Sequence, residues 1–110
     1  MTEVLLVFTT CPDAGTAARI ADALLEQRLA ACVSEGAPVT SRYRWQGVVE
    51  TATEIPLQIK CVAERYAQVE QLIRELHPYA VPEVVALPVV AGSAPYLRWV
   101  ADETQAPRQA

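Results

Sequence analysis

A tight turn at Gln46-Gly47, between two long runs of strand-forming residues, constrains the fold more than any other feature of the chain. One run extends from Val39 to Trp45, and the other from Val48 to about Val62. Glycine tolerates the positive φ that a two-residue turn requires, so the pattern predicts a β-hairpin. The later part of the second run alternates apolar and polar residues, which is typical of a strand with one buried face. Pro56 lies within it and predicts a bulge or an unpaired N–H.

Helical and strand patterns flank this hairpin on both sides, in an order that defines the fold class. Strand–helix–hairpin–helix–strand is the split βαβ pattern, so we expect an α+β, ferredoxin-like βαββαβ sandwich with a long central hairpin and an extra C-terminal helix. The 110 residues form one domain, with a frayed tail over 104–110. The other expected elements are a strand over 4–8, a helix from the N-cap Asp13 to about Leu29, a helix over 64–76, a strand over 83–90 and a helix over 94–103.

The expected sheet has a face that two helices leave uncovered. A solvated face should be polar at alternate positions, but the runs Val4 to Phe8 and Val84 to Val90 are apolar on both faces. The hairpin is also longer than either outer strand, so part of its edge has no partner in the chain. We therefore expect other copies of the protein to cover this face and edge. The alternative is a monomer with unusually long strands.

Composition excludes several classes of partner and compartment. The net charge is −4, and the nine basic residues are scattered singly, which argues against nucleic-acid binding. The longest apolar run near the N-terminus is too short to cross a membrane and lacks the basic flank of a signal peptide. Three widely spaced cysteines do not form a disulfide framework. Reduced thiols in a domain of this size indicate a cytoplasmic protein.

A series of short motifs, in order along the chain, resembles the CutA family of divalent-cation tolerance proteins from Val4 to about Val100. Each motif alone is weakly specific, and their order and spacing together carry the resemblance. Two stretches depart from the family's pattern: Ser34 to Pro38, where an Asn and an apolar bend are usual, and Pro56. The matching motifs are Leu29-Ala30-Ala31-Cys32-Val33, Thr40-Ser41, Tyr43-Arg44-Trp45, Gly47, Glu54, Lys60, His77-Pro78-Tyr79, Val81-Pro82-Glu83, Leu87-Pro88-Val89, Gly92, Tyr96-Leu97 and Trp99.

The resemblance implies a ferredoxin-like fold and a tight homotrimer built like the nitrogen-regulatory PII proteins. It also implies a part in divalent-metal tolerance, with copper or another divalent cation as the bound ion. Catalytic signatures such as G-x-S-x-G, G-x-G-x-x-G and Walker loops are missing from the sequence. We therefore expect a binding protein rather than an enzyme.

Three residues are candidate metal ligands. The thiol of Cys32 suits Cu(I) and Zn(II), although a free cysteine also serves as a small buried apolar residue. His77 is the single histidine and follows a predicted helix, where it can also act as a capping residue. Cys11 lies in the expected first strand–helix loop, where its thiol would be accessible. Close ligand pairs are missing from the sequence, so we expect any site to be shared between subunits.

A second group of polar and aromatic residues lies on or near the expected hairpin and the loops around it. In a trimer they would line a cleft between subunits, where an acid–lysine pair with aromatic walls orients a small ligand. A PII-like module that binds a nucleotide or other metabolite is therefore the alternative function. The same residues can instead fill subunit interfaces and set strand register. The group consists of Tyr43, Trp45, Glu54, Lys60, Tyr79 and Glu83.

Overall fold

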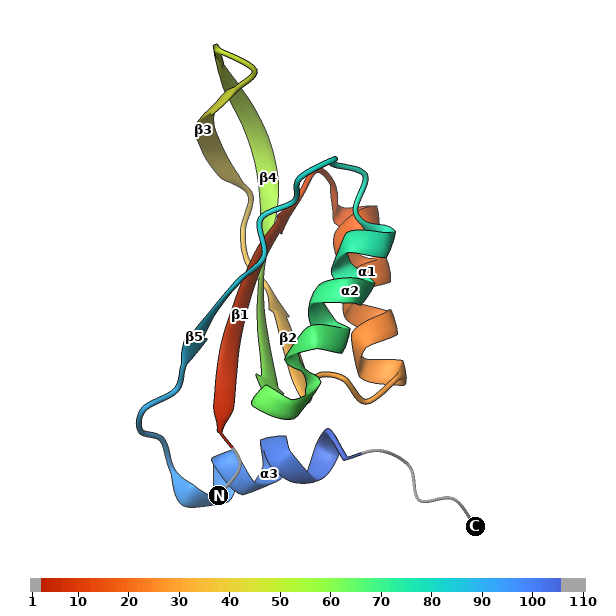
Figure 1. Ribbon diagram of the computed structural model, residues 1–110, viewed down its shortest axis with the longest axis vertical. Helices are drawn as coiled ribbons and strands as arrows, with labels where there is room; N and C mark the ends of the chain where they lie inside the picture. Colours follow the sequence, from red (N-terminus) through yellow and green to blue (C-terminus); the bar gives the residue numbers. More distant parts are fainter. Residues whose placement is uncertain (1–2, 106–110) are drawn as a thin grey trace.

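The computed structural model describes residues 3–105 as an antiparallel sheet with two helices packed on one face and a third helix across one end (Figure 1). This α+β arrangement confirms the predicted fold class. The elements are β1 Val4–Cys11, α1 Ala14–Glu26, β2 Cys32–Glu35, β3 Val39–Trp45, β4 Val48–Val62, a 3₁₀ turn Ala63–Arg65, α2 Tyr66–Leu76, β5 Val85–Pro88 and α3 Ala94–Glu103.

Strand β4 organises the whole sheet, whose order is β2-β4-β1-β5 with β3 paired to the other half of β4. Residues 55–62 of β4 pair with β1, and residues 57–60 also pair with β2 on the opposite edge. Residues 48–54 pair only with β3 and form the hairpin that projects beyond the body of the domain (Figure 1). The hairpin strands have the predicted bounds, and its turn places Gln46 at φ 51° and Gly47 at φ 81°. Two positive φ values are the signature of a type I′ turn.

The main core lies between the sheet and helices α1 and α2. Val7 of β1 and Ile59 of β4 point toward the helices and are completely buried, as are Ile20 of α1 and Ile73 of α2. The side-chain carboxylate of Asp13 accepts a hydrogen bond of 2.7 Å from the backbone N–H of Thr16, which confirms the predicted N-cap of α1. The helix ends at Glu26, before the predicted Leu29, because Arg28 turns the backbone to a left-handed φ of 57°.

Helix α3 covers one end of the sheet's other face. Val100 packs there against Val4 and Val62, and these three form a second, smaller buried cluster. Thr104 follows the helix and was predicted to begin the frayed tail. That prediction is wrong at Thr104, which is 2% exposed and donates its hydroxyl to the carbonyl of Val100 over 2.8 Å. Residues 106–110 of the predicted tail lie outside the described residues.

Beyond α3 this face of the sheet carries exposed apolar side chains, which we call the open face. Val85 and Leu87 of β5 are 51% and 54% exposed. Side chains alternate along β4, so the open face continues along the hairpin to Tyr43 and Trp45, which are about two-fifths exposed. The apolar open face predicted from the sequence is therefore present in the single chain.

Pro56 causes no bulge, because the pairing of β4 with β1 stays in register from Ile55 to Leu57. The Pro56 carbonyl instead accepts a hydrogen bond of 2.9 Å from the N–H of Gly36, immediately after the end of β2. Proline lacks an N–H, and it stands where the neighbouring strand has just ended. Its place in the strand therefore leaves the ladder intact.

Candidate functional site

Polar and ionisable side chains meet where β1 ends, beside β4 and the segment that follows α2. We call that segment, residues 77–84, the strap; it connects α2 to β5 and contains no helix or strand. The Tyr79 hydroxyl donates a hydrogen bond of 3.0 Å to Glu54 Oε2. Glu54 is only 5% exposed. Burial first, and then the bond to Glu54, raise the pKa of Tyr79 to about 12, so the phenol stays protonated at neutral pH.

His77 is buried in the same region, with both ring nitrogens in hydrogen bonds. Nε2 lies 2.7 Å from the carbonyl oxygen of Thr10, and Nδ1 lies 3.2 Å from the backbone nitrogen of Tyr79. The ring also contacts that of Tyr79, with 4.7 Å between centroids. In this conformation the imidazole has no free lone pair for a metal ion. The predicted helix-end position is confirmed, since His77 is the C-cap residue of α2.

Cys11 ends strand β1, and its side chain is completely buried. The expectation of an accessible thiol in the strand–helix loop is therefore wrong. Burial, with a smaller contribution from the nearby Asp13 carboxylate, raises its pKa to about 11. Cys61, also buried, has its pKa raised to about 11 by burial alone. Both sulfurs are therefore neutral thiols at neutral pH, a poor state for ligating metal.

Cys32 differs from the other two cysteines, because it is partly exposed and lies on the open face. It stands directly across from Lys60 in the β2–β4 ladder, and its sulfur is 3.9 Å from the Ser34 hydroxyl. The Lys60 ammonium extends over the ring of Tyr96 from α3, 5.8 Å from the centroid. Cys32 is thus the candidate thiol that solvent or another copy of the chain can reach.

The six residues proposed for a ligand cleft do not gather in one place within the chain. Tyr43 approaches Tyr79 closely enough that its charge would raise the Tyr79 pKa, so these two join Glu54 at the strap. Lys60 lies six positions from Glu54 along β4, about 20 Å away, so these two residues do not pair within one chain. Trp45 is at the far end of the hairpin, and Glu83 is exposed on the strap.

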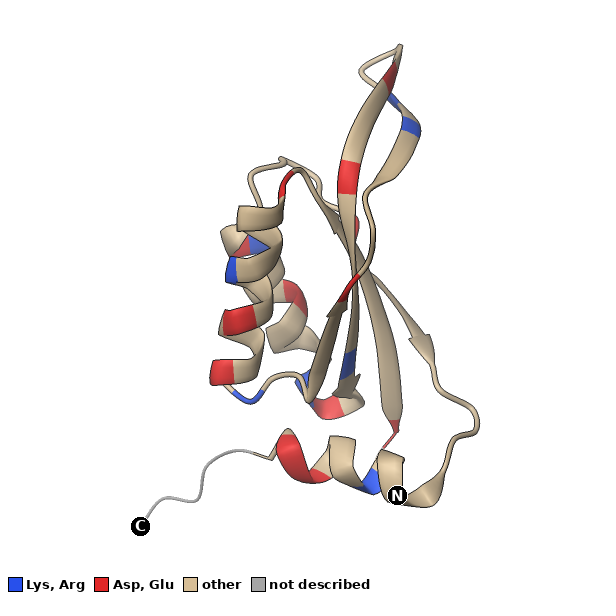
Figure 2. Ribbon diagram, turned by 180° about the vertical axis from the view of Figure 1, so that it is seen from behind, with Lys and Arg blue, Asp and Glu red and all other residues tan. Residues whose placement is uncertain are grey.

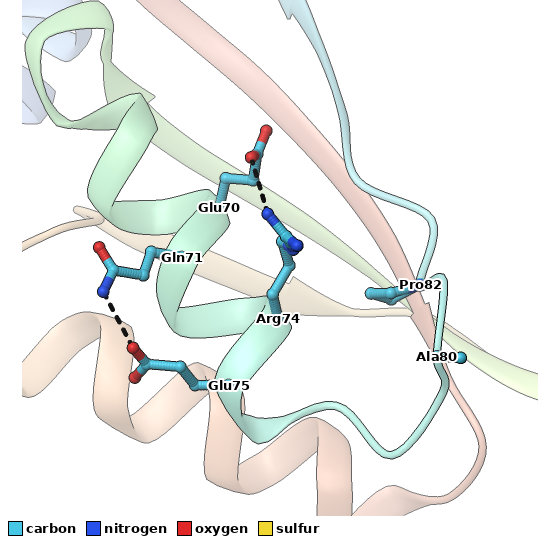
Figure 3. A pocket seen from close by; sticks show the side chains of 6 residues that line it. All are labelled: Glu70, Gln71, Arg74, Glu75, Ala80 and Pro82. Atoms are coloured by element: carbon cyan, nitrogen blue, oxygen red, sulfur yellow. Dashed lines mark hydrogen bonds and ion pairs between the residues drawn. The ribbon is translucent and has the colours of Figure 1, made fainter.

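Among the described residues, acidic and basic ones are concentrated on the helices and the hairpin, and the strands below the hairpin carry few (Figure 2). An open groove runs beside the C-terminal half of α2, next to the strap (Figure 3). Arg74 in this groove lies 3.9 Å from Glu70, and Gln71 donates to Glu75, so its polar groups pair along the helix. None of the predicted site residues lines it.

Within residues 3–105, no three of the His, Cys, Asp and Glu side chains are close enough to hold a metal ion together. This part of the chain therefore does not supply a complete set of metal ligands by itself. The sequence reasoning did not include Thr10, whose carbonyl holds His77, because a backbone acceptor leaves no signal in side-chain patterns. The contact between Lys60 and Tyr96 was not predicted either, because it depends on how α3 packs against the sheet.

The strand order and helix positions define a ferredoxin-like domain extended by a hairpin and a C-terminal helix. Residues 5–103 match the family described as CutA1 divalent ion tolerance protein, and the chain belongs to this family. The crystal structure of CutA1 from the psychrotrophic bacterium Shewanella sp. SIB1 is 50% identical, with a TM-score of 0.90 over 93% of this chain and 95% of that one.

Of two further relatives, one is much longer than this chain and the other has a name that states its location. Protein CutA from Mus musculus is 42% identical over 94% of this chain, but the chain spans only 58% of the mouse protein's length. A structure from Archaeoglobus fulgidus is named the periplasmic divalent cation tolerance protein CutA. It is 33% identical, with a TM-score of 0.90 over 93% of this chain and 99% of that one. Among the described residues, every helix is too short or too polar to cross a membrane.

Proposed function

We propose that this chain is a divalent-cation tolerance protein that acts as a homotrimer and binds copper or another divalent metal by way of Cys32. The family description and the name of the Archaeoglobus relative support the link to divalent cations. Neither description names a reaction, so binding rather than catalysis is the activity we propose.

The observation that supports assembly is the apolar open face. Exposed Val85 and Leu87 continue into the exposed aromatic side of the hairpin, and together they exceed what single scattered surface residues would explain. Covering them with further copies removes apolar area from water, which is favourable in proportion to the area. The number three rests on the resemblance to PII-like trimers.

Sedimentation velocity tests the assembly. We expect the wild type to sediment as three chains at micromolar concentration, and Leu87→Lys, which places a charge on the open face, to sediment as smaller species. Gln71→Lys adds the same charge on the exposed side of α2 and should leave the trimer intact. A monomeric wild type would overturn the proposal.

Metal binding is assigned to Cys32 because it alone among the three cysteines is partly exposed, while Cys11 and Cys61 are buried. Thiolate sulfur is a good ligand for Cu(I) and Zn(II), and affinities in the divalent series are highest for copper. Since residues 3–105 of one chain do not bring three donors together, the remaining ligands come from another copy that covers the open face.

Competition against a chromogenic Cu(I) chelator, without oxygen, tests this site. Cys32→Ser should lose copper binding, and Ser34→Ala, which alters the neighbour of the sulfur and keeps the thiol, should retain it. Cadmium offers a redox-inert second probe, because thiolate ligation produces a charge-transfer band. Equal binding by Cys32→Ser and the wild type would remove Cys32 from the site.

We also propose a cytoplasmic location, which the free thiols of all three cysteines support. Cell fractionation with antibody detection tests it directly. Recovery of the protein with periplasmic markers, as the name of the Archaeoglobus relative would suggest, would overturn this part of the proposal.

A further inference from the structure

Two alternate residues, His77 and Tyr79, hold the first part of the strap to the end of the sheet. His77 and Tyr79 point inward to hydrogen-bond Thr10 and Glu54, while Ala80 and Val81 between them and β5 are exposed. A segment without helix or strand has few backbone hydrogen bonds of its own, so its position depends on such contacts. These two contacts therefore hold the first part of the strap, while Val84 at its other end packs against the main core.

The protonation state of His77 follows from its partners. The backbone N–H of Tyr79 can only donate, so Nδ1 must present a lone pair to it. The carbonyl of Thr10 can only accept, so the single ring proton lies on Nε2. The strap is therefore closed on a neutral imidazole of one tautomer. A charged imidazolium would direct a second N–H at the N–H of Tyr79.

We propose that His77 is a pH-dependent latch: its neutral ring holds the strap closed, and protonation of Nδ1 releases Tyr79 from the ring and from Glu54. The Tyr79 ring contacts the imidazole, and its hydroxyl bonds Glu54, so a rotation of the Tyr79 peptide moves both contacts together. The charged ring still donates from Nε2 to Thr10, and a charged donor strengthens that bond. The ring stays in place while the strap opens at Tyr79, and Val84 remains packed on the core.

The surroundings of His77 separate the imidazole, which gains a charge in the proposed latch, from the Tyr79 phenol, which stays neutral. His77 is the C-cap residue of α2, where the helix dipole interacts favourably with a positive ring. The phenol of Tyr79 and the thiol of Cys11, with pKa values of about 12 and about 11, remain neutral across the range in which histidine titrates. Cys11 ends β1 next to Thr10, and the charged groups that act on it are Asp13 from the β1–α1 loop, Glu35 from β2 and Glu54 from β4. The groups that act on Tyr79 are Glu54, Tyr43 from the hairpin and Cys11.

Nuclear magnetic resonance tests the latch cleanly, because His77 is the only histidine. At neutral pH, a long-range proton–nitrogen spectrum of the wild type should show a protonated Nε2 and a bare Nδ1. As the imidazole titrates, the hydrogen-exchange protection factor of the Tyr79 amide should fall about tenfold, the effect of losing one hydrogen bond. The amide of Ile59, in the middle of the sheet, should keep its protection. A proton on Nδ1 at neutral pH, or unchanged protection at Tyr79, would overturn the proposal.

Two variants identify the titrating group. In His77→Asn, the side-chain oxygen can accept from the Tyr79 amide but does not titrate, so protection at Tyr79 should become independent of pH. In Glu54→Gln, the imidazole remains, so the fall in protection should persist. The opposite pattern, with the pH response retained in His77→Asn and lost in Glu54→Gln, would assign the titration to the carboxylate and contradict the latch.

Discussion

Tyr79 on the strap donates its hydroxyl to Glu54 of β4 over 3.0 Å, although Glu54 lies 25 positions earlier in the chain. Glu54 is only 5% exposed, and among the described residues the Tyr79 hydroxyl is the side-chain group that donates to it. It therefore ties the connection between α2 and β5 to the base of the hairpin.

Removing that hydroxyl with Tyr79→Phe should lower the free energy of unfolding by about 1–3 kcal/mol, because a buried carboxylate loses its donor. Tyr66→Phe is the matched control, since the Tyr66 hydroxyl donates over the same 3.0 Å to Glu70, whose side chain is 41% exposed. Water replaces the lost donor there, so the control should change by less than about 0.5 kcal/mol. Urea unfolding at one protein concentration measures both, and equal losses would contradict the argument from burial.

Thiol accessibility separates Cys32 from the other two cysteines. In the Cys32→Ser variant, Cys11 and Cys61 are the remaining thiols, and both are completely buried with pKa values of about 11. The native variant should therefore show no fast reaction with a thiol-specific disulfide reagent, while the unfolded variant should release two equivalents per chain. A fast native reaction of either thiol would show that β1 or β4 opens locally.

Stability should fall at alkaline pH because of these same thiols. Their folded-state pKa of about 11 lies above the ordinary value of 9.0, so the unfolded chain releases the protons first. The stability they confer is complete below pH 9.0 and is lost as pH rises toward about 11. Urea unfolding at several pH values in this window measures the slope. Cys61→Ala should reduce that slope, and Cys32→Ala serves as the comparison; identical slopes in all three proteins would contradict the assignment.

Two buried threonines should respond in opposite directions to replacement by valine, which has nearly the same shape. The Thr9 hydroxyl is buried on β1 and has no hydrogen-bond partner among residues 3–105, so Thr9→Val should stabilise the protein by about 1 kcal/mol. The Thr104 hydroxyl donates to Val100 over 2.8 Å, so Thr104→Val should cost about 1 kcal/mol. Thermal or urea unfolding of the two variants gives the signs. Destabilisation by Thr9→Val would indicate that a bound water satisfies the hydroxyl.

The hairpin could be predicted closely from the sequence because its signals are local. The turn at Gln46-Gly47 and the alternation along β4 define both strand bounds, which agree with the structure. The predicted helix α1 was too long, because the backbone turns left-handed at Arg28 and the residue there is not a glycine, which would have indicated a helix end. The bulge expected at Pro56 does not occur, since the effect of a proline depends on where the neighbouring strand ends, and that is a tertiary property.

The candidate site was harder to predict, because its residues meet through folding rather than through spacing. Glu54 and Tyr79 were both selected from the sequence, yet nothing in the pattern joined them to each other or to the carbonyl of Thr10. Cys11 was placed in a loop because Pro12 follows it, but pairing with β4 extends the strand through Cys11 and buries the thiol. Burial and long-range contacts of this kind follow from the packed structure alone.

The unbroken register of β4 has a consequence for how the chain can vary. One strand pairs with β1 and β2 at one end and with β3 at the other, so the two ends share a single alternation of side chains. One residue inserted between Glu54 and Leu57 would rotate the hairpin by half a turn, exchanging the aromatic side of Tyr43 and Trp45 for the side that carries Arg42 and Arg44. Insertions and deletions in this stretch should therefore be tolerated only in steps of two residues.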